Sequence, residues 1–239
     1  MKVCRFTLSG KTACFRMPDV NSDVYITYGH IHKVALLGLL GAVIGLDGYG
    51  QKLSVSGKPV FYEELQNLQV SIFPKVKTGM FLKKTQCFTN TTGFSNTQQS
   101  VPCTQMVREQ WLEHPEWEIM FLLDSPIAEK IADFLQERKC VYQPYLGKTE
   151  HVAVITDVCV EDIASSQDME IPLECLVPAE QVISVDCKHN ADILYQEELP
   201  IRLDDTFGLY QLTNFVYTDG WYRVQSAYML ANGRYVLFY

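Results

Sequence analysis

The chain has 239 residues, of which 47% are hydrophobic and 20% charged, so it can bury a core and lacks the composition of a disordered or collagen-like chain. Its net charge of −8 is unevenly distributed, because residues 1–108 carry +7 and residues 109–239 carry −15. A polyanionic ligand is therefore not excluded: the basic half can bind it while the acidic half faces away or meets a basic protein. The simpler alternative is that the acidic half is a solvated surface.

The eight cysteines include no C-x-x-C pair, which argues against a zinc site. The chain begins with MKVCRFTLSG, which has no apolar signal core, and the apolar run 34–46 is too short to span a bilayer. We expect a cytoplasmic protein with reduced thiols, no metal or other cofactor and no membrane partner.

The first expected elements are a strand, a loop and a helix. Apolar residues alternate over 3–8 and predict a strand in a sheet with one open side, while residues 9–29 predict a basic, aromatic loop. A helix is expected over about 31–46. Its three glycines, which cost about 1 kcal/mol each relative to alanine, share one face and indicate a close neighbour there. We expect a packed strand at that face, or alternatively a bound chain; the glycines are Gly38, Gly41 and Gly45.

The remaining chain alternates strand and helix signals before it becomes β-rich. Ser125 and Pro126 are a favourable N-cap and first helical residue, so the helix they begin is the most secure element. The expected elements are a helical turn at 62–68, a strand at 68–73, a long hairpin at 79–106, a strand at 117–123, a helix at 126–139, a strand at 152–158, and short strands beyond 161 that end in a hairpin at 228–239.

This order is compatible with an α+β fold: a ferredoxin-like β-α-β-β-α-β domain over 1–160, followed by a C-terminal β-rich region over 161–239. RNA-recognition domains use the same arrangement. Many proteins that bind no RNA use it too, so the fold alone does not decide the function.

Two histidines precede the first expected helix. Metal-independent ribonucleases need a general acid and base, and histidine suits both roles near neutral pH. The cluster of Tyr28, His30, His32 and Lys33 therefore indicates a nuclease site or an RNA-gripping loop, and the plain alternative is an exposed helix-terminal turn. We favour RNA contact without catalytic residues, because the other histidines are scattered along the chain.

A second basic segment enters the expected hairpin. Lysines neutralise phosphates without reading sequence, and aromatic side chains between them can stack on bases. The alternative is a solubilised edge hairpin. The length of the excursion favours RNA contact; the lysines are Lys75, Lys77, Lys83 and Lys84, with Phe81, Phe88 and Phe94 between or after them.

Several segments occur in a characteristic order: Phe6-Thr-Leu-Ser-Gly10, Ala13-Cys-Phe-Arg16, Tyr28 before the glycine-containing helix 35–45, Arg108-Glu-Gln-Trp-Leu-Glu-His-Pro-Glu-Trp117, and Gln143-Pro-Tyr-Leu-Gly147 before Glu150-His-Val-Ala153. Together they resemble the CRISPR-associated Cas-five family, and the last pair resembles its type I-B members. The match covers roughly the first two-thirds of the chain.

The resemblance implies a RAMP-type, RRM-like ferredoxin fold whose thumb hairpin corresponds to about 79–106. It implies a non-catalytic subunit of a type I surveillance complex (Cascade) that binds the 5′ handle of CRISPR RNA (crRNA), caps the backbone filament, contacts the backbone and large subunits, and meets target DNA only indirectly. One branch, type I-C, processes the RNA itself, so a metal-independent endoribonuclease is the alternative. The expected RNA-binding residues are Lys11, Phe15, Arg16, Tyr28, His30, His32, Lys33, Lys75, Lys77, Lys83, Lys84 and Arg108.

Overall fold

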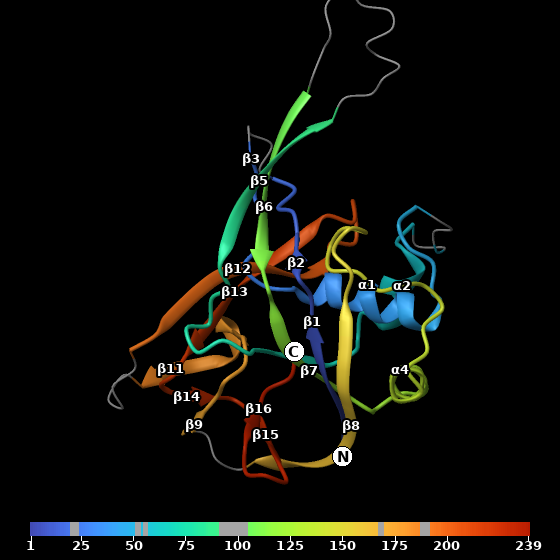
Figure 1. Cartoon of the computed structure of the whole chain (residues 1–239). Helices are drawn as coiled ribbons and strands as arrows, with labels where there is room; N and C mark the ends of the chain where they lie inside the picture. The colour runs from blue at the N-terminus through green and yellow to red at the C-terminus, as the bar shows by residue number, and fades with distance from the viewer. Residues whose placement is uncertain (20–23, 51–53, 55–56, 91–104, 167–169, 187–191) are drawn as a thin grey trace, which may run out of the picture.

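The computed structural model describes residues 1–19, 24–50, 54, 57–90, 105–166, 170–186 and 192–239 (Figure 1). Its elements in chain order are β1 (Lys2–Ser9), β2 (Thr12–Ala13), β3 (Val24–Tyr25), α1 (Lys33–Ile44), α2 (Val60–Leu65), β4 (Val70–Pro74), β5 (Lys83–Asn90), β6 (Gln105–Glu113), β7 (Glu116–Leu122), α4 (Pro126–Gln136), β8 (Val154–Ser166), β9 (Glu170–Pro172), β10 (Val177–Pro178), a 3₁₀ turn (Ala179–Gln181), β11 (Val182–Asp186), β12 (Leu194–Leu203), β13 (Tyr210–Thr218), β14 (Trp221–Val224), β15 (Ala227–Leu230) and β16 (Tyr235–Val236).

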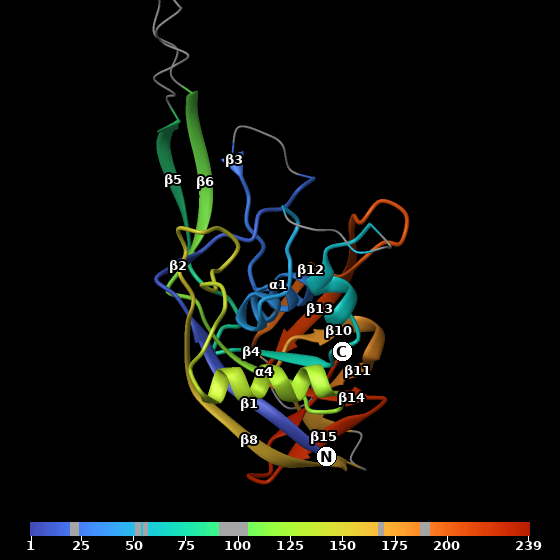
Figure 2. The ribbon, with the colours of Figure 1, turned by 90° about the vertical axis from the view of Figure 1, so that its right-hand side faces the viewer.

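A six-stranded sheet with the order β16-β15-β8-β1-β7-β4 forms the centre of the molecule. Its strands β8, β1, β7 and β4 are each antiparallel to their neighbours. Helices α1, α2 and α4 lie on one side of this sheet and strands β9, β11 and β14 lie on the other, while the β12–β13 hairpin reaches back to α1 and α2 (Figures 1 and 2). The expected mixture of strands and helices is therefore present, in a mostly β structure.

Both faces of β1 are covered, so the expected open side of this strand is wrong. Cys4, Phe6 and Leu8 are fully buried on one face, and Val3 and Thr7 are buried on the other. The second face is covered because the C-terminal strands fold back over it, and Arg234 from this region reaches Glu118 of β7 at 2.6 Å. Sequence alternation could not reveal this cover, which comes from residues far along the chain.

Helix α1 is held at both ends by local signals. His32 has extended backbone angles and its Nδ1 accepts a hydrogen bond from the Ala35 N–H at 3.2 Å, while Gly45 ends the helix in the left-handed region at φ 83°. The close neighbour that the structure places on the glycine face is a residue of a helix, not of the expected strand. It is Phe61 of α2, whose Cβ lies 2.6 Å from the position that a Cβ on Gly41 would occupy.

Several expected boundaries need correction. The helical turn expected at 62–68 is α2 at Val60–Leu65, and the strand expected at 152–158 is β8, which runs to Ser166. The supposed loop 9–29 is partly paired, because β2 and β3 both add to β6. Helix α4 begins at Pro126 as expected, with Ser125 Oγ accepting from the Ala128 N–H at 3.4 Å.

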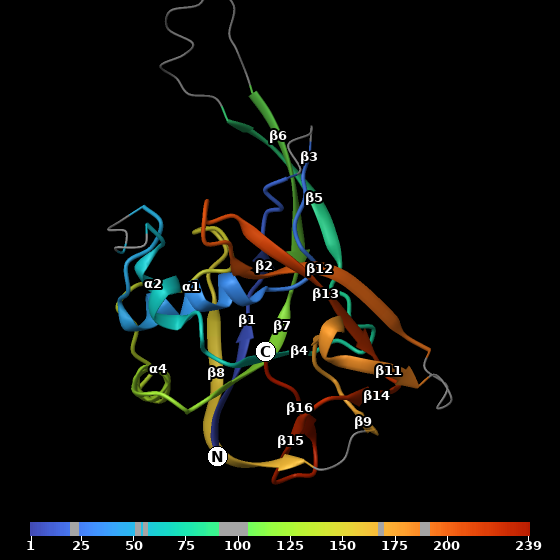
Figure 3. The same ribbon diagram turned by 180° about the vertical axis from the view of Figure 1, so that it is seen from behind.

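The long hairpin is present as β5 and β6, which pair from Lys83↔Leu112 to Asn90↔Gln105. It projects beyond the body of the molecule (Figures 1 and 3). The returning strand continues to Glu113, beyond the expected end at residue 106, because β5 pairs with it as far as Leu112 and β2 pairs with it at Glu113. The tip, residues 91–104 with the candidate Phe94, lies outside the described residues.

Candidate nucleic-acid interface

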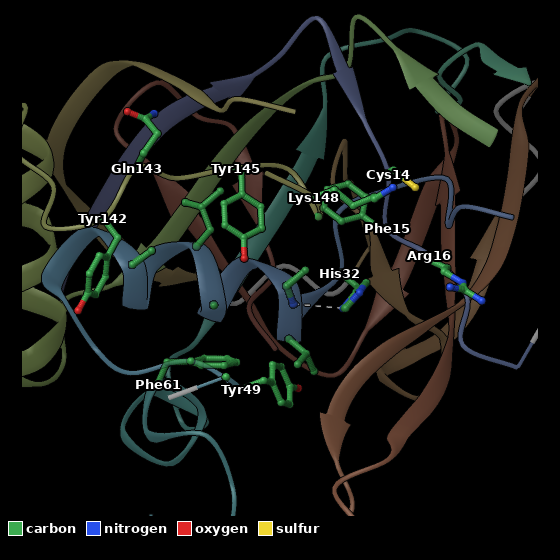
Figure 4. A pocket seen from close by; sticks show the side chains of 18 of the residues that line it. Cys14, Phe15, Arg16, His32, Tyr49, Phe61, Tyr142, Gln143, Tyr145 and Lys148 are labelled. Atoms are coloured by element: carbon green, nitrogen blue, oxygen red, sulfur yellow. Dashed lines mark hydrogen bonds between the residues drawn. The ribbon is translucent and has the colours of Figure 1, made fainter. Parts of the chain in front are cut away.

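A groove of about 870 Å³ follows the outward face of α1, and we call it the α1 groove. Its floor is apolar because α1 carries only one charged residue, at its first position. Tyr142 and Tyr145 lie on one side of the helix, and Tyr49 and Phe61 lie on the other (Figure 4). The groove also contacts the projecting hairpin, through Phe88, Val107 and Glu109. It thus joins the body of the molecule to the hairpin.

The rims of the groove present aromatic rings to solvent. Tyr49, Tyr142 and Tyr145 are 57%, 43% and 44% exposed, which is high for side chains of this size. At the hairpin end, the guanidinium carbon of Arg16 lies 3.7 Å from the ring centroid of Tyr25, and both residues line the groove. Exposed rings and a stacked guanidinium are surfaces on which unpaired bases stack.

A buried carboxylate closes the hairpin end of the groove. Glu109 accepts from Lys148 Nζ at 3.0 and 2.9 Å and from Trp111 Nε1 at 2.8 Å. Burial alone would raise the pKa of Glu109, but the hydrogen bonds from Trp111 and Lys148 outweigh it and lower that pKa below its usual value. Glu109 therefore stays charged, and it compensates Lys148.

The loop that carries Lys148 is fixed to the residues beside it in the groove. The Cys14 N–H donates to the Leu146 carbonyl at 3.1 Å, and the Leu146 N–H donates to the His151 carbonyl at 2.7 Å. Gly147 adopts φ +89°, and an added Cβ would lie 1.9 Å from the Cys14 carbonyl oxygen. Only glycine fits this close approach, so Gly147 sets the position of Tyr145 and Lys148 on the rim.

The expected lysines gather at the base of the hairpin, where most of them already have partners. Lys75 pairs with Glu116 at 2.5 Å and Lys84 with Glu113 at 3.1 Å, while Lys83 Nζ donates to the Thr27 carbonyl at 3.2 Å. Lys11 lies at the same end, because its carbonyl accepts from the His114 N–H at 2.9 Å. The side chains of Lys11, Lys77 and Arg108 are exposed and make no ion pair with the described residues.

His30 is fully buried, so its side chain does not lie at the surface where contact with RNA was expected. Its Nε2 donates to the Gly79 carbonyl at 2.9 Å, and its Nδ1 accepts from Trp117 Nε1 at 3.2 Å. Both ring nitrogens are therefore used, and the neutral ring ties the entrance of the hairpin to β7. Burial lowers the pKa of His30 to about 3.

The neighbours of His30 in the expected cluster are buried as well, so these side chains are not exposed on the surface. His32 caps α1, and Lys33 Nζ donates to the main-chain oxygen of Tyr239 at 3.0 Å. Burial lowers the pKa of His32 to about 3 and that of Lys33 to about 8. Tyr28 and Phe15 pack edge-to-face on the His32 ring. Phe15 and His32 still contribute to the inner wall of the groove, whereas Tyr28 and Lys33 do not line it.

The buried histidines predict acid sensitivity. An unfolded histidine binds a proton below pH 6.5, whereas His30 and His32 resist protonation until about pH 3, so the unfolding free energy should fall as the pH drops through this interval. Each histidine contributes a slope of up to about 1.4 kcal/mol per pH unit. Denaturant unfolding at pH 7, 5.5 and 4.5 measures this slope.

His32→Asn keeps a capping side chain and should reduce the slope by about half of the histidine contribution. His114→Asn, at an exposed position, is the matched control and should leave the slope unchanged. An identical slope in His32→Asn and the unaltered chain would contradict this assignment.

Sequence reasoning missed the aromatic rims of the groove. Tyr145 lies in a short segment after α4 whose only signal was the resemblance of residues 143–147 to a family motif, and no pattern in the sequence indicated Tyr49 or Tyr142. Among the described residues, no group of three or more His, Cys, Asp or Glu side chains is placed to hold a metal ion. None of the helices in the described part of the chain has the length and apolar content that a membrane span requires.

Comparison with known proteins gives likenesses of structure only. No family model and no curated protein sequence matches the chain. A CRISPR protein from Archaeoglobus fulgidus is 14% identical, with 99% of this chain and 98% of that chain covered and a TM-score of 0.56. A chain of a CRISPR RNA-guided surveillance complex is also 14% identical, with 97% and 92% covered and a TM-score of 0.49. The chain thus shares the fold of the Archaeoglobus fulgidus CRISPR protein.

Proposed function

We propose that the chain is a non-catalytic RNA-binding subunit of a type I CRISPR surveillance complex, closest to type I-B, that holds the 5′ handle of crRNA. The observation that carries the proposal is the α1 groove, which combines an apolar floor, exposed aromatic rims and Arg16 at the hairpin end. Such a surface suits single-stranded bases, which expose their faces to stacking, better than a duplex.

The strand order supports a ferredoxin-like unit as the scaffold of this site. The neighbours β8-β1-β7-β4 are antiparallel, α1 lies between β1 and β4 in the chain, and α4 lies between β7 and β8. This is the connectivity of a β-α-β-β-α-β arrangement. The sequence resemblance and the fold shared with a CRISPR protein point to the same class. By this reading the β5–β6 hairpin is the thumb, and the neighbours are the backbone and large subunits, with target DNA met indirectly.

The cations at the hairpin base are assigned to phosphates. Lys11 and Lys77 are exposed there, and no described acidic side chain pairs with either of them. Each phosphate contact on a single strand contributes about 0.7 to the slope of log affinity against log salt. The double variant Lys11→Ala/Lys77→Ala should therefore lower this slope by about 1.4 in a salt titration with handle RNA.

Arg223→Ala is the control for that titration, because Arg223 is exposed on β14, which lies on the other side of the central sheet. Its salt slope should equal that of the unaltered chain. A double variant with an unchanged slope would remove Lys11 and Lys77 from the interface.

A non-catalytic role is proposed because the candidate acid and base do not face the groove together. His30 uses both ring nitrogens inside the core and does not line the groove, and His32, which does line it, is 3% exposed with its Nδ1 engaged by the Ala35 N–H. Cleavage without a metal needs a general acid and a general base around the 2′-hydroxyl, and this pair does not supply both in the groove. Incubating repeat RNA with the protein in EDTA should leave the RNA intact, and a discrete cut would favour the endoribonuclease alternative.

The function is tested by co-expressing the chain with the proteins encoded beside it and a CRISPR repeat transcript. The expected result is a complex that contains this chain and crRNA, and a purified chain that binds handle RNA more tightly than a scrambled strand. Equal affinity for both strands, together with no RNA in the purified complex, would contradict the proposal.

A further inference from the structure

The turn between β12 and β13 exposes two large apolar side chains. Phe207 is 80% exposed and Leu209 is 64% exposed, although Leu203 and Phe215 in the adjoining strands are almost fully buried. Isolated exposed apolar residues are common on protein surfaces, but two large ones within three positions of one short turn offer a compact apolar surface that a partner can bury. We call residues 204–209 the apolar turn.

The apolar turn is held in one conformation by a single carboxylate. Asp204 Oδ1 accepts from the backbone N–H groups of Thr206 and Phe207 at 2.8 and 2.7 Å, and its Oδ2 accepts from that of Leu209 at 2.5 Å. The Asp204 N–H also donates to the Leu209 carbonyl at 2.8 Å. The turn is thus ordered before any partner binds, which reduces the entropy lost on association.

The base of the turn is fixed to the segment around α2. The Leu203 N–H donates to the hydroxyl of Tyr62 at 2.8 Å, and Lys58 Nζ lies 2.6 Å from Asp205 Oδ1. Lys58 is itself nearly covered, with a side chain that is 12% exposed, whereas the side chain of Asp205 is 97% exposed. The turn itself carries two carboxylates and no cation, and Lys58 balances one of them, so the net charge beside the apolar side chains is negative.

This charge selects among possible partners. RNA phosphates and an anionic membrane would both be repelled by the net negative charge of the turn, and a second copy of this chain, with net charge −8, would meet general repulsion. A protein surface with an apolar pocket and a basic rim complements the turn in both respects. We propose that the apolar turn is a preformed anchor that inserts Phe207 and Leu209 into such a pocket on a neighbouring protein subunit.

The inference rests on the proposed function, because it takes the neighbour to be another protein of the same complex. The test compares purified complexes that contain the unaltered chain, Phe207→Ser/Leu209→Ser, or Leu194→Ser as a control. Leu194 is 71% exposed at the opposite end of β12. All three positions are exposed, so thermal unfolding should confirm that every variant folds.

The expected result is that Phe207→Ser/Leu209→Ser weakens binding of one protein subunit by about 30-fold, as for other interface anchors, while the variant binds handle RNA like the unaltered chain. Asp205→Lys should weaken binding of the same subunit in the same assay, because the added positive charge would repel a basic rim. Leu194→Ser should assemble normally.

Retention of every subunit by Phe207→Ser/Leu209→Ser at unchanged affinity would overturn the inference and leave the proposed function standing. Two other results would also overturn it. Loss of RNA binding with all protein subunits retained would assign the turn to RNA, and a change only in self-association would assign it to a second copy of this chain. Failure of the unaltered chain to join any RNA-containing complex would overturn the proposed function and, with it, this inference.

Discussion

Replacing Tyr142 and Tyr145 together by alanine is expected to weaken binding of single-stranded handle RNA by about 100-fold. Both rings are more than 40% exposed on the rim of the α1 groove, so their removal leaves the core intact. Stacking of one base on an aromatic ring is worth about 1–3 kcal/mol, and two lost platforms account for the expected change. Fluorescence anisotropy with labelled RNA at one fixed salt concentration measures the effect.

The matched control retains the rings and removes only the hydroxyl groups. Tyr142→Phe/Tyr145→Phe should bind within about threefold of the unaltered chain, because stacking depends on the ring face. Val152→Ala controls for loss of an exposed apolar side chain beside Tyr145, to which Val152 is bridged. Unchanged binding by the double alanine variant would show that RNA does not occupy this rim.

Replacing Gly147 by alanine is expected to lower the free energy of unfolding by about 3–5 kcal/mol. The residue has φ +89°, which costs an alanine about 1–2 kcal/mol, and its Cβ would overlap the Cys14 carbonyl. The loop must move away, which breaks the Cys14 N–H to Leu146 bond and draws Lys148 from the buried Glu109. A buried carboxylate without its partner adds a further penalty. Chemical denaturation measures the loss.

Gly233→Ala separates the backbone strain from the steric overlap. Gly233 has φ +82°, close to that of Gly147, but an added Cβ there would meet no atom within 4 Å. It should cost only the strain of about 1–2 kcal/mol. Equal losses in the two variants would show that the packing of the loop against Cys14 does not hold the groove.

The elements that the sequence predicted well are those determined by local signals. Helix α4 begins with a capping serine and a proline, and both act through their own backbone, so its start needs no knowledge of the rest of the chain. The long hairpin is similarly local, because β5 and β6 are neighbours in the chain as well as in the sheet.

The burial of the His30 cluster could not be predicted in this way. Polar residues next to a helix start are usually exposed, but His30 and Lys33 have hydrogen-bond partners inside the core. Trp117 donates to His30, the Gly79 carbonyl accepts from His30, and the main-chain oxygen of Tyr239 accepts from Lys33. These partners are separated from the cluster by between 49 and 206 positions. A sequence pattern cannot show such distant partners. The cluster therefore had the pattern of an exposed RNA-binding site, although its side chains are buried in the core.

The rim of the α1 groove could not be predicted for a related reason, because two segments that are distant in the sequence form it. Tyr49 follows α1, whereas Tyr142 and Tyr145 follow α4, and backbone hydrogen bonds from Val141 and Tyr142 to Val43 and Ala42 bring the second segment onto the first helix. Of the residues expected to contact RNA, Phe15, Arg16, His32 and the hairpin residue Phe88 line the groove.

The central claim is that RNA lies in the α1 groove. Photo-crosslinking of 4-thiouridine-substituted handle RNA to the full chain measures the position of the RNA directly. We predict crosslinked peptides that contain Arg16, Tyr49, Tyr142 or Tyr145, and the base of the β5–β6 hairpin. Crosslinks confined to strands β9, β11 and β14, which carry none of the residues that line the groove, would contradict the account.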